Sequence, residues 1–507
     1  IPYDQTQRTT GYCDIHNAGN SAGVYVDAIY NSPESFLRNE RAESEIFVWG
    51  EEAALASPPQ LEKVVAAIEE NGNRNGWDGA DYKDWLNSYR SYIKNKLLRQ
   101  IIKKEKEYQM YYVEDELVKK EIYDKNLDQL KFIMDYAKYP VSKNNDITYY
   151  KSGEEFYPEF LSELKKAEKF IFMEYFIINK GKMWDGILNI LKEKASNGVE
   201  VRIIYDDMGS LGMLKANYAE ELSGYNIKCI SFNKLSPFKG IFMNNRDHRK
   251  ITVIDGNIAY TGGLNLSDEY INKKIKYGYW KDNAIKLQGN SVWNLTIMFL
   301  SLWNSYKKED KDYLKFKTTD NLKIKPNGYL SAYASVPING VLEGEDVYLN
   351  IINKATKYVY IITPYLIIDT DMINSIILAF KRGVDVRIVI PGIPDKKIVY
   401  DLTMSYVKNL VDAGIKVYTY TPGFIHSKIF VSDDNKATVG TINLDYRSLY
   451  LHFENGVYLE DVKEIEDILN DVNNILTESH LLTKKETNYN IFRKVWQSIL
   501  RFFAPLF

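Results

Sequence analysis

The sequence is poor in the residues that build cross-linked or metal-bound scaffolds. Its 507 residues contain only two cysteines, Cys13 and Cys229, which lie far apart and show no metal-ligand spacing. This excludes a disulfide framework and fits a reducing interior. Only five histidines are present, with no H-E-x-x-H motif and no paired-carboxylate cluster, so we expect neither a bound metal nor another cofactor.

Long hydrophobic runs and an excess of charge are also missing. No stretch approaches the roughly 18 uninterrupted apolar residues of a membrane-spanning helix, and the chain starts without a signal-peptide pattern. The formal net charge is −3 at pH 7, so bulk charge gives no support for a nucleic-acid partner. The length and the 45% hydrophobic content predict two or three domains with sizeable cores.

What the sequence does contain is a doubled octet. His-Arg-Lys-Ile-Thr-Val-Ile-Asp occupies 248–255 and His-Ser-Lys-Ile-Phe-Val-Ser-Asp occupies 426–433, so both spell H-x-K-x4-D. An Asn follows each histidine by 17 residues, at Asn265 and Asn443. Side chains two apart on a strand share a face, so each octet offers an imidazole beside an ammonium group. Two octets brought together would carry the groups needed for phosphoryl transfer.

Longer segments repeat as well. Gly198-Val-Glu-Val-Arg-Ile reappears as Gly383-Val-Asp-Val-Arg-Ile. Each copy predicts a strand, a helix, a second strand and the octet strand, over 170–178, 183–196, 199–205 and 248–254, and again over 358–368, 371–381, 384–390 and 426–432. This alternation predicts an α/β fold, and a repeat of this size indicates a duplicated domain.

The octets and their surroundings resemble the phospholipase D superfamily, and most closely its bacterial cardiolipin synthase branch. The matching segments include EYFII at 174–178, NNRDHRKITVIDG at 244–256, TGGLNLSDEYINKK at 261–274, YTPGFIHSKIFVSDD at 420–434 and ATVGTINLDYRSLYLHFENGVY at 437–458. The likeness extends from about Tyr149 to Phe507. It implies two phospholipase D-like domains, each a mixed sheet flanked by helices, packed as a pseudo-dimer with one shared active site.

The resemblance also implies a mechanism in which one octet histidine forms a phosphohistidine and the other acts as acid and then base. The implied catalytic residues are those of the octets: His248, Lys250, Asp255, His426, Lys428 and Asp433. The two aspartates lie at the strand ends and are expected to be mainly architectural. The implied substrate-binding residues are Asn265, Asn443, Asp282, Glu454, Glu174 and Tyr175.

Within this set, Asp282 and Glu454 are the candidates for orienting the imidazoles. Glu174, Tyr175, Asp206 and Asp207 could line the pocket, or some of them could only pack or cap. For His16, His452 and His480 we expect structural roles.

The implied activity is phosphatidyl transfer between two phosphatidylglycerol molecules, which gives cardiolipin and glycerol. A phospholipase D-type hydrolase that uses water stays open as an alternative, whereas the intact octets disfavour an inactive lipid-binding protein. The expected partners are phosphatidylglycerol and a membrane surface, and no nucleic acid. The expected location is peripheral, on the cytoplasmic face of the bacterial cell membrane, because the two hydrophobic helices usual ahead of the catalytic part in this family are not found.

Composition divides the chain further. The first 82 residues hold a single lysine and the next hundred hold eighteen. We expect an N-terminal segment of unknown type over 1–84, a charged helical linker over 85–135, the two phospholipase D-like domains over 136–327 and 328–485, and an amphipathic C-terminal helix over 486–507. The basic run Lys94–Lys106 fits either a solvated face or attraction to anionic lipid.

The C-terminal helix carries two unlike faces. Arg493, Lys494, Gln497, Ser498 and Arg501 occupy one side, and the opposite side holds Phe492, Val495, Trp496, Ile499, Leu500 and Phe503. The pattern fits a helix docked on its domain and fits an interfacial membrane helix equally well.

Overall fold

The computed structural model describes residues 96–235, 244–318, 324–337 and 341–504. The expected segment 1–84, with Cys13 and His16, and the start of the linker lie outside these ranges. The chain divides into two compact units. One consists of Tyr108–Lys239, Met243–Pro337 and Leu342–Phe507 and therefore contains both octets. The other is described mainly through helix α7, Lys96–Gln109.

The described part of the expected linker is helical. After α7 come α8 (Glu116–Asp124) and α9 (Asp128–Asp135). The Asp115 carboxylate accepts hydrogen bonds from the backbone N–H groups of Leu117 and Val118, which caps the start of α8.

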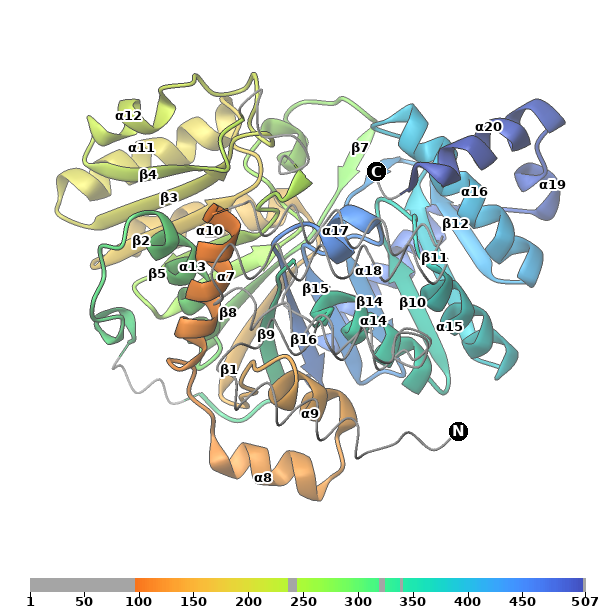
Figure 1. Ribbon diagram of the computed structural model, residues 1–507, viewed down its shortest axis with the longest axis horizontal. Coiled ribbons are helices and arrows are strands. Elements are labelled where there is room, and N and C mark those ends of the chain that lie inside the picture. The colour runs from red at the N-terminus through yellow and green to blue at the C-terminus, as the bar shows by residue number, and fades with distance from the viewer. Residues whose placement is uncertain (1–95, 236–243, 319–323, 338–340, 505–507) are drawn as a thin grey trace, which may run out of the picture. The chain divides into compact units, whose positions relative to one another are not determined.

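The first octet lies in a seven-stranded mixed sheet with the order β1-β8-β6-β5-β2-β3-β4 (Figure 1). Its strands are β1 (Asn145–Tyr150), β2 (Phe170–Tyr175), β3 (Glu200–Asp206), β4 (Ile227–Phe232), β5 (Lys250–Ile254), β6 (Ile258–Gly262) and β8 (Ala284–Gly289). Strands β2, β3 and β4 are parallel and are connected by α11 (Lys182–Ser196) and α12 (Tyr218–Ser223). The remaining pairs are antiparallel.

The second octet lies in an eight-stranded sheet with the order β17-β12-β11-β10-β14-β15-β16-β9. Its strands are β9 (Tyr329–Ser335), β10 (Tyr358–Ile362), β11 (Asp385–Pro391), β12 (Lys416–Tyr420), β14 (Ile429–Ser432), β15 (Lys436–Gly440), β16 (Glu454–Glu460) and β17 (Ser479–Leu481). Read from β9 to β12, this order reproduces that of the first sheet from β1 to β4. The prediction of a duplicated α/β fold is therefore confirmed.

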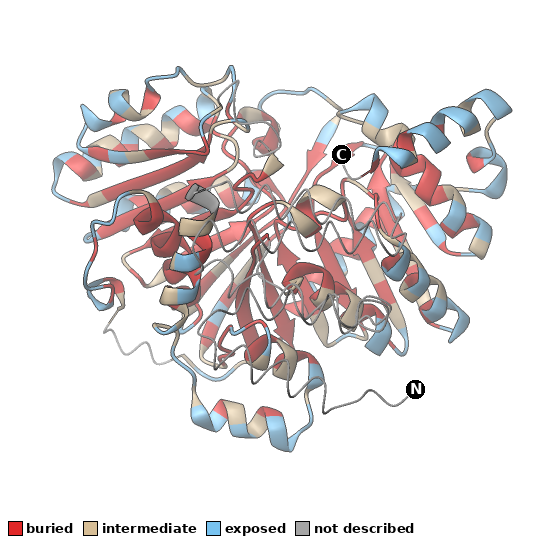
Figure 2. Ribbon diagram, in the orientation of Figure 1, coloured by how far each residue is buried: buried red, intermediate tan, exposed pale blue. Residues whose placement is uncertain are grey.

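Helices cover both sheets, and the strands form the buried layers (Figure 2). Those not yet placed are α10 (Gly153–Lys166), α13 (Val292–Tyr306), α14 (Glu343–Lys354), α15 (Thr370–Lys381), α16 (Lys397–Ala413), α17 (Tyr446–Tyr450), α18 (Ile465–Thr477), α19 (Lys484–Thr487) and α20 (Ile491–Phe502), with the 3-10 turns η2 (Asp268–Ile271) and η3 (Leu314–Phe316). Helix α13 is mostly apolar and is buried on all sides along almost its whole length, as expected for a core helix. Among the described residues, no helix combines the length and the apolar character needed to cross a bilayer.

Candidate active site

The backbone of each octet pairs with the other half of the protein just where its histidine lies. The N–H of His248 donates to the carbonyl of Phe453 at 2.9 Å, and the N–H of His426 donates to that of Lys281 at 2.7 Å. The second contact extends a two-stranded parallel pairing between β7 (Tyr279–Lys281) and β13 (Gly423–Ile425). The sequence predicted the octet strands over 248–254 and 426–432, but the strands start later, at Lys250 and Ile429. Each histidine precedes its strand, because its backbone pairs with the other half instead.

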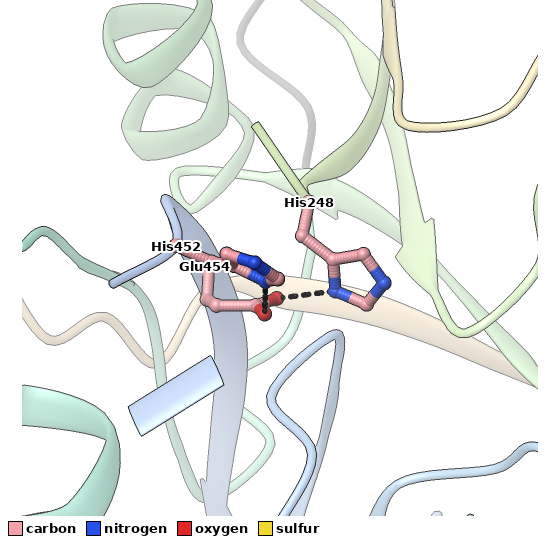
Figure 3. Close-up of side chains that lie close together, drawn as sticks. All are labelled: His248, His452 and Glu454. Atoms are coloured by element: carbon pink, nitrogen blue, oxygen red, sulfur yellow. Dashed lines mark hydrogen bonds and ion pairs between the residues drawn. The ribbon is translucent and has the colours of Figure 1, made fainter. Parts of the chain in front are cut away.

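The side chains of the histidines follow the same crosswise pattern. Nδ1 of His248 lies 2.9 Å from Oε2 of Glu454, a residue of the second sheet (Figure 3). Nδ1 of His426 lies 2.7 Å from Oδ2 of Asp282, which precedes β8 of the first sheet. Both carboxylates are fully buried. Each half thus supplies the carboxylate that orients the histidine of the other half, so the two octets form one site.

The octet lysines add fixed cations to this site. Lys250 Nζ donates to the carbonyl of His248 at 2.6 Å, and Lys428 Nζ lies 3.0 Å from Nε2 of His426. Burial lowers the pKa of Lys250 to about 7 and that of Lys428 to about 8. An anion bound between them would raise the pKa of both lysines and so favour their charged form. The pair is therefore suited to binding a phosphate group.

The imidazoles are held in the form that a nucleophile needs. Burial, aided by Lys250, lowers the pKa of His248 well below its ordinary value. Burial and Lys428 lower the pKa of His426 to about 4, although Asp282 opposes the shift. A neutral imidazole that donates Nδ1–H to a carboxylate keeps its lone pair on Nε2. Both histidines therefore keep a lone pair on Nε2 for a phosphorus atom or a proton, and on His426 that nitrogen lies 3.0 Å from Lys428 Nζ.

The two asparagines are placed differently from one another. Asn265 uses Oδ1 to accept from the N–H of Ile177 at 3.0 Å and Nδ2 to donate to the Tyr270 hydroxyl at 2.7 Å. Asn443 is also buried, and its Oδ1 has no hydrogen-bond partner among the described residues. Asn265 therefore braces the site, and Asn443 is the better placed of the two for a ligand.

The two pocket candidates on β2 lie on opposite faces of the strand, and each contacts a residue of the first octet. Glu174 is fully buried, with Oε1 3.8 Å from Nη1 of Arg249. Tyr175 instead packs in the hydrophobic core of the first half and hydrogen-bonds the Thr252 hydroxyl at 2.9 Å. Side chains alternate along β2, so Tyr175 shares a face with Ile171 and Met173 of that core. Substrate binding by Tyr175 stays a prediction.

Asp206 and Asp207 hold loops. Asp206 accepts from the N–H groups of Met208 and Gly209, both at 2.9 Å, and from that of Asp247 at 3.0 Å. Burial raises its pKa to about 7, against the effect of nearby Arg246. Asp207 accepts from the Ser231 hydroxyl at 2.6 Å and from the Leu235 N–H at 2.9 Å. Both therefore serve as caps at the end of β3.

The octet aspartates lie outside the imidazole cluster, so the structure does not place Asp255 and Asp433 among the catalytic groups. Asp255 accepts from the N–H groups of 168, 169 and 170, each at 2.7 Å. Asp433 accepts from the N–H groups of 356, 357 and 358 at 2.7, 2.8 and 3.0 Å. Both have φ of 54°, a left-handed conformation that Asp tolerates better than most residues. They tie the octet turn to the start of the neighbouring strand.

Asp255→Asn and Asp433→Asn are each expected to lower the free energy of unfolding by about 1.5–3 kcal/mol, since a charge-assisted cluster of hydrogen bonds is lost. Asp434→Asn, a change in the exposed neighbour, is the matched control and should cost much less. Urea titration gives the stabilities, and turnover is measured on the same samples. Unchanged stability together with complete loss of turnover would contradict the architectural role.

The same contacts fix the pH dependence of Asp433. Burial alone would raise its pKa, but the hydrogen bonds from Tyr358, Lys357 and Thr356 outweigh burial and lower it. The stability that Asp433 contributes is therefore present above the ordinary pKa of an aspartate and is lost as pH falls through the lowered value.

With this geometry established, comparisons with known proteins assign the family. The family model described as "Cardiolipin synthase, PLD-like domain" matches residues 160–284 and 348–476, one copy in each half. The chain belongs to the cardiolipin synthase family. It is accordingly a phosphatidyltransferase of the phospholipase D-like class, and it resembles the cardiolipin synthase of Alkalihalophilus pseudofirmus, with 35% identity over 73% of this chain and 74% of the relative.

Two further proteins extend this comparison. An uncharacterized protein of Streptococcus mutans serotype c is 46% identical over 73% of this chain and 80% of its own length. The crystal structure of phosphatidylserine synthase from Haemophilus influenzae Rd KW20 aligns with a TM-score of 0.53 and 17% identity, over 71% of this chain and 93% of that one. The second likeness supports the fold alone.

Two further residues lie next to Glu454: Thr441, which the sequence analysis did not name, and His452, for which it predicted a structural role. The Thr441 hydroxyl donates to Oε2 of Glu454, and the His452 ring lies 5.6 Å from that of His248, centroid to centroid. An alignment of the two halves would have shown that Thr441 and His452 differ from their counterparts in the first half. The segments to align are TGGLN (261–265) with VGTIN (439–443), and YWKDN (279–283) with LHFEN (451–455).

Proposed function

We propose that the protein is a cardiolipin synthase, which transfers a phosphatidyl group from one phosphatidylglycerol to the hydroxyl of another and releases glycerol. The observation that carries this proposal is the crosswise pairing of His248 with Glu454 and of His426 with Asp282. It gives two oriented imidazoles beside two buried lysines. Double displacement at phosphorus needs these groups: a nucleophile, a general acid and base, and cations for the phosphate oxygens. Relatives named cardiolipin synthase, at about 35% identity, support the choice of substrate.

In the first step, Nε2 of one histidine attacks phosphorus. A P–N bond forms, and the bond from phosphorus to the glycerol oxygen breaks. The other histidine enters this step protonated at Nε2, a form that the bound phosphodiester anion favours, and gives that oxygen its proton. In the second step, the hydroxyl of the incoming phosphatidylglycerol gives its proton to that same imidazole. Its oxygen then bonds to phosphorus, and the P–N bond breaks. Lys250 and Lys428 hold the non-bridging oxygens, whose charge grows in both transition states.

Purified protein incubated with phosphatidylglycerol vesicles tests this proposal. Mass spectrometry should find cardiolipin and free glycerol in equal amounts, both with and without excess chelator. Phosphatidic acid without cardiolipin would establish the hydrolase instead. Absence of any phosphatidyl product would reject phosphatidylglycerol as the substrate.

A lipid substrate requires access to a membrane, and α20 offers a surface for it. The helix docks on α16 through its polar side, where Arg493 Nη2 donates to Asp401 Oδ1 at 2.6 Å and Arg501 Nε donates to Ser405 Oγ at 2.9 Å. Leu500 is buried on that side, contrary to the expectation that it belongs to the exposed apolar face. The apolar residues are left outward, with Phe492 83% and Phe502 79% exposed (Figure 2).

The start of α16, the helix on which α20 docks, lies near the site. Helix α16 begins two residues after Asp395, whose carboxylate acts electrostatically on Lys428 and accepts from the Tyr365 hydroxyl at 2.7 Å. We therefore propose that the outward face of α20 enters the lipid surface beside the active site. Because Arg493 and Arg501 contact α16, this attachment depends mainly on apolar burial and should respond weakly to salt.

The double variant Phe492→Asn/Phe502→Asn is expected to weaken binding to phosphatidylglycerol vesicles by about 100-fold or more, since each buried Phe contributes about 1.5–3 kcal/mol. Co-sedimentation measures the effect. Leu378→Asn, which removes an exposed apolar side chain on α15, is the control and should bind as the wild type does. Equal binding by all three proteins would mean that α20 does not contact the membrane.

A further inference from the structure

Beside His248 lies a second imidazole that the transfer chemistry does not use. His452 is 9% exposed, and neither of its ring nitrogens has a hydrogen-bond partner within the described part of the chain. The same holds for Oε1 of Glu454. Buried polar atoms are nearly always hydrogen-bonded. His452 Nδ1 and Glu454 Oε1 face one another but are 3.6 Å apart, too far for a hydrogen bond, and this requires an explanation.

The three side chains converge as metal ligands do. His248 Nδ1 lies 2.9 Å from Oε2 of Glu454, and His452 Nδ1 lies 3.6 Å from Oε1 (Figure 3). One ligand atom from each residue lies within 4.8 Å of the other two. A zinc ion with bonds of about 2.0–2.2 Å separates its tetrahedral ligands by roughly 3.4 Å. Two imidazoles and a carboxylate are also a ligand set that zinc accepts, with a fourth position open.

The convergence is confined to one half of the site. Trp280 takes the place of His452 beside His426, with its ring also 5.6 Å from the imidazole, centroid to centroid. Gly263 takes the place of Thr441, and a Cβ there would lie 2.0 Å from Oδ1 of Asp282. Among the described residues, no other trio of His, Cys, Asp and Glu side chains converges in this way. The arrangement is therefore specific to His248.

We propose that Zn²⁺, or a similar divalent transition-metal ion, binds to His248, His452 and Glu454 and inhibits the enzyme. Coordination needs the lone pair of His248 Nδ1, so the proton now donated to Glu454 moves to Nε2 of the same ring. An imidazole protonated at Nε2 can neither attack phosphorus nor accept a proton from an alcohol. The ion also removes Glu454 as the orienting carboxylate. Inhibition thus follows whichever of the two chemical roles His248 plays.

Calorimetric titration of ZnCl₂ into the full chain tests the binding. We expect one saturable site in the wild type and at least about tenfold weaker zinc binding in His452→Phe. Even the loss of a residue that only hydrogen-bonds a metal ligand lowers metal affinity about tenfold or more, and His452 would be a ligand itself. His480→Phe is the matched control, since His480 also contacts a single carboxylate, Glu486, at 2.8 Å but on the exposed surface. Glu454→Gln, which keeps the side-chain shape, provides a second variant. Absence of a saturable site, or equal affinity in His452→Phe and the wild type, would overturn the proposal.

Turnover of phosphatidylglycerol tests the inhibition, and this arm alone rests on the proposed function. ZnCl₂ should slow the wild type and His480→Phe, and excess EDTA should restore both rates. His452→Phe, compared with its own zinc-free rate, should need at least about tenfold more zinc for the same inhibition. Saturable binding without any effect on the rate would overturn the inhibitory role. Failure of the wild type to turn over phosphatidylglycerol would leave the calorimetric result intact and reject only the proposed function.

Discussion

His248→Ala and His426→Ala are each expected to abolish turnover, with a loss on the order of 10⁴-fold or more, and the double variant should be no worse than either single one. Residues that act as one unit are strongly non-additive in this way. Each imidazole is buried against a carboxylate from the opposite half, so neither half retains a complete set of groups once one histidine is gone.

Turnover of phosphatidylglycerol, with cardiolipin quantified by mass spectrometry, provides the measurement. His480→Ala, a change in an exposed histidine, is the control and should retain the wild-type rate. If either octet variant kept a large fraction of the activity, the two halves would be independent sites and the shared-site interpretation would fail.

Asp282→Asn is expected to lower the turnover number by about 10²- to 10⁴-fold with little loss of stability, as the loss of an orienting carboxylate does in other histidine-based sites. Oδ1 of Asp282 accepts the N–H of Asn283 at 2.9 Å, so an amide at this position keeps its oxygen there. Its NH₂ group then faces Nδ1 of His426. That nitrogen must become an acceptor, and the proton is forced onto Nε2, where the lone pair is needed.

Asp385→Asn is the matched control, because the Asp385 carboxylate pairs with Arg387 and Lys416 and with neither octet histidine. The pH profile gives a second readout. Burial would raise the pKa of Asp282, but His426 and Lys428 outweigh it and lower the pKa, so the wild type should show no loss of rate from this carboxylate above pH 4. A rate for Asp282→Asn within a few-fold of the wild type would mean that another group orients His426.

The repeated segments of the sequence predicted the fold well, because a duplicated strand-helix-strand pattern is compatible with few architectures. They predicted His248, Lys250, His426 and Lys428 for the same reason. The sequence could not tell that Glu454 serves His248, since the two lie 206 residues apart and the pairing depends on how the sheets meet. Helical spacing likewise predicted both faces of α20 but not that the polar face would be the one to dock.

The crosswise pairing has a consequence for how the protein is made. Translation delivers His248 and Lys250 early, and the first sheet can fold while the rest of the chain is still being synthesised. Glu454 opens β16, near the end of the chain. Until that strand has joined the second sheet, His248 has no carboxylate to orient it. Until His426 has been made, Asp282 has no octet histidine to receive it. A nascent chain that has not reached His426 therefore holds half of the octet histidines and lysines and no oriented imidazole.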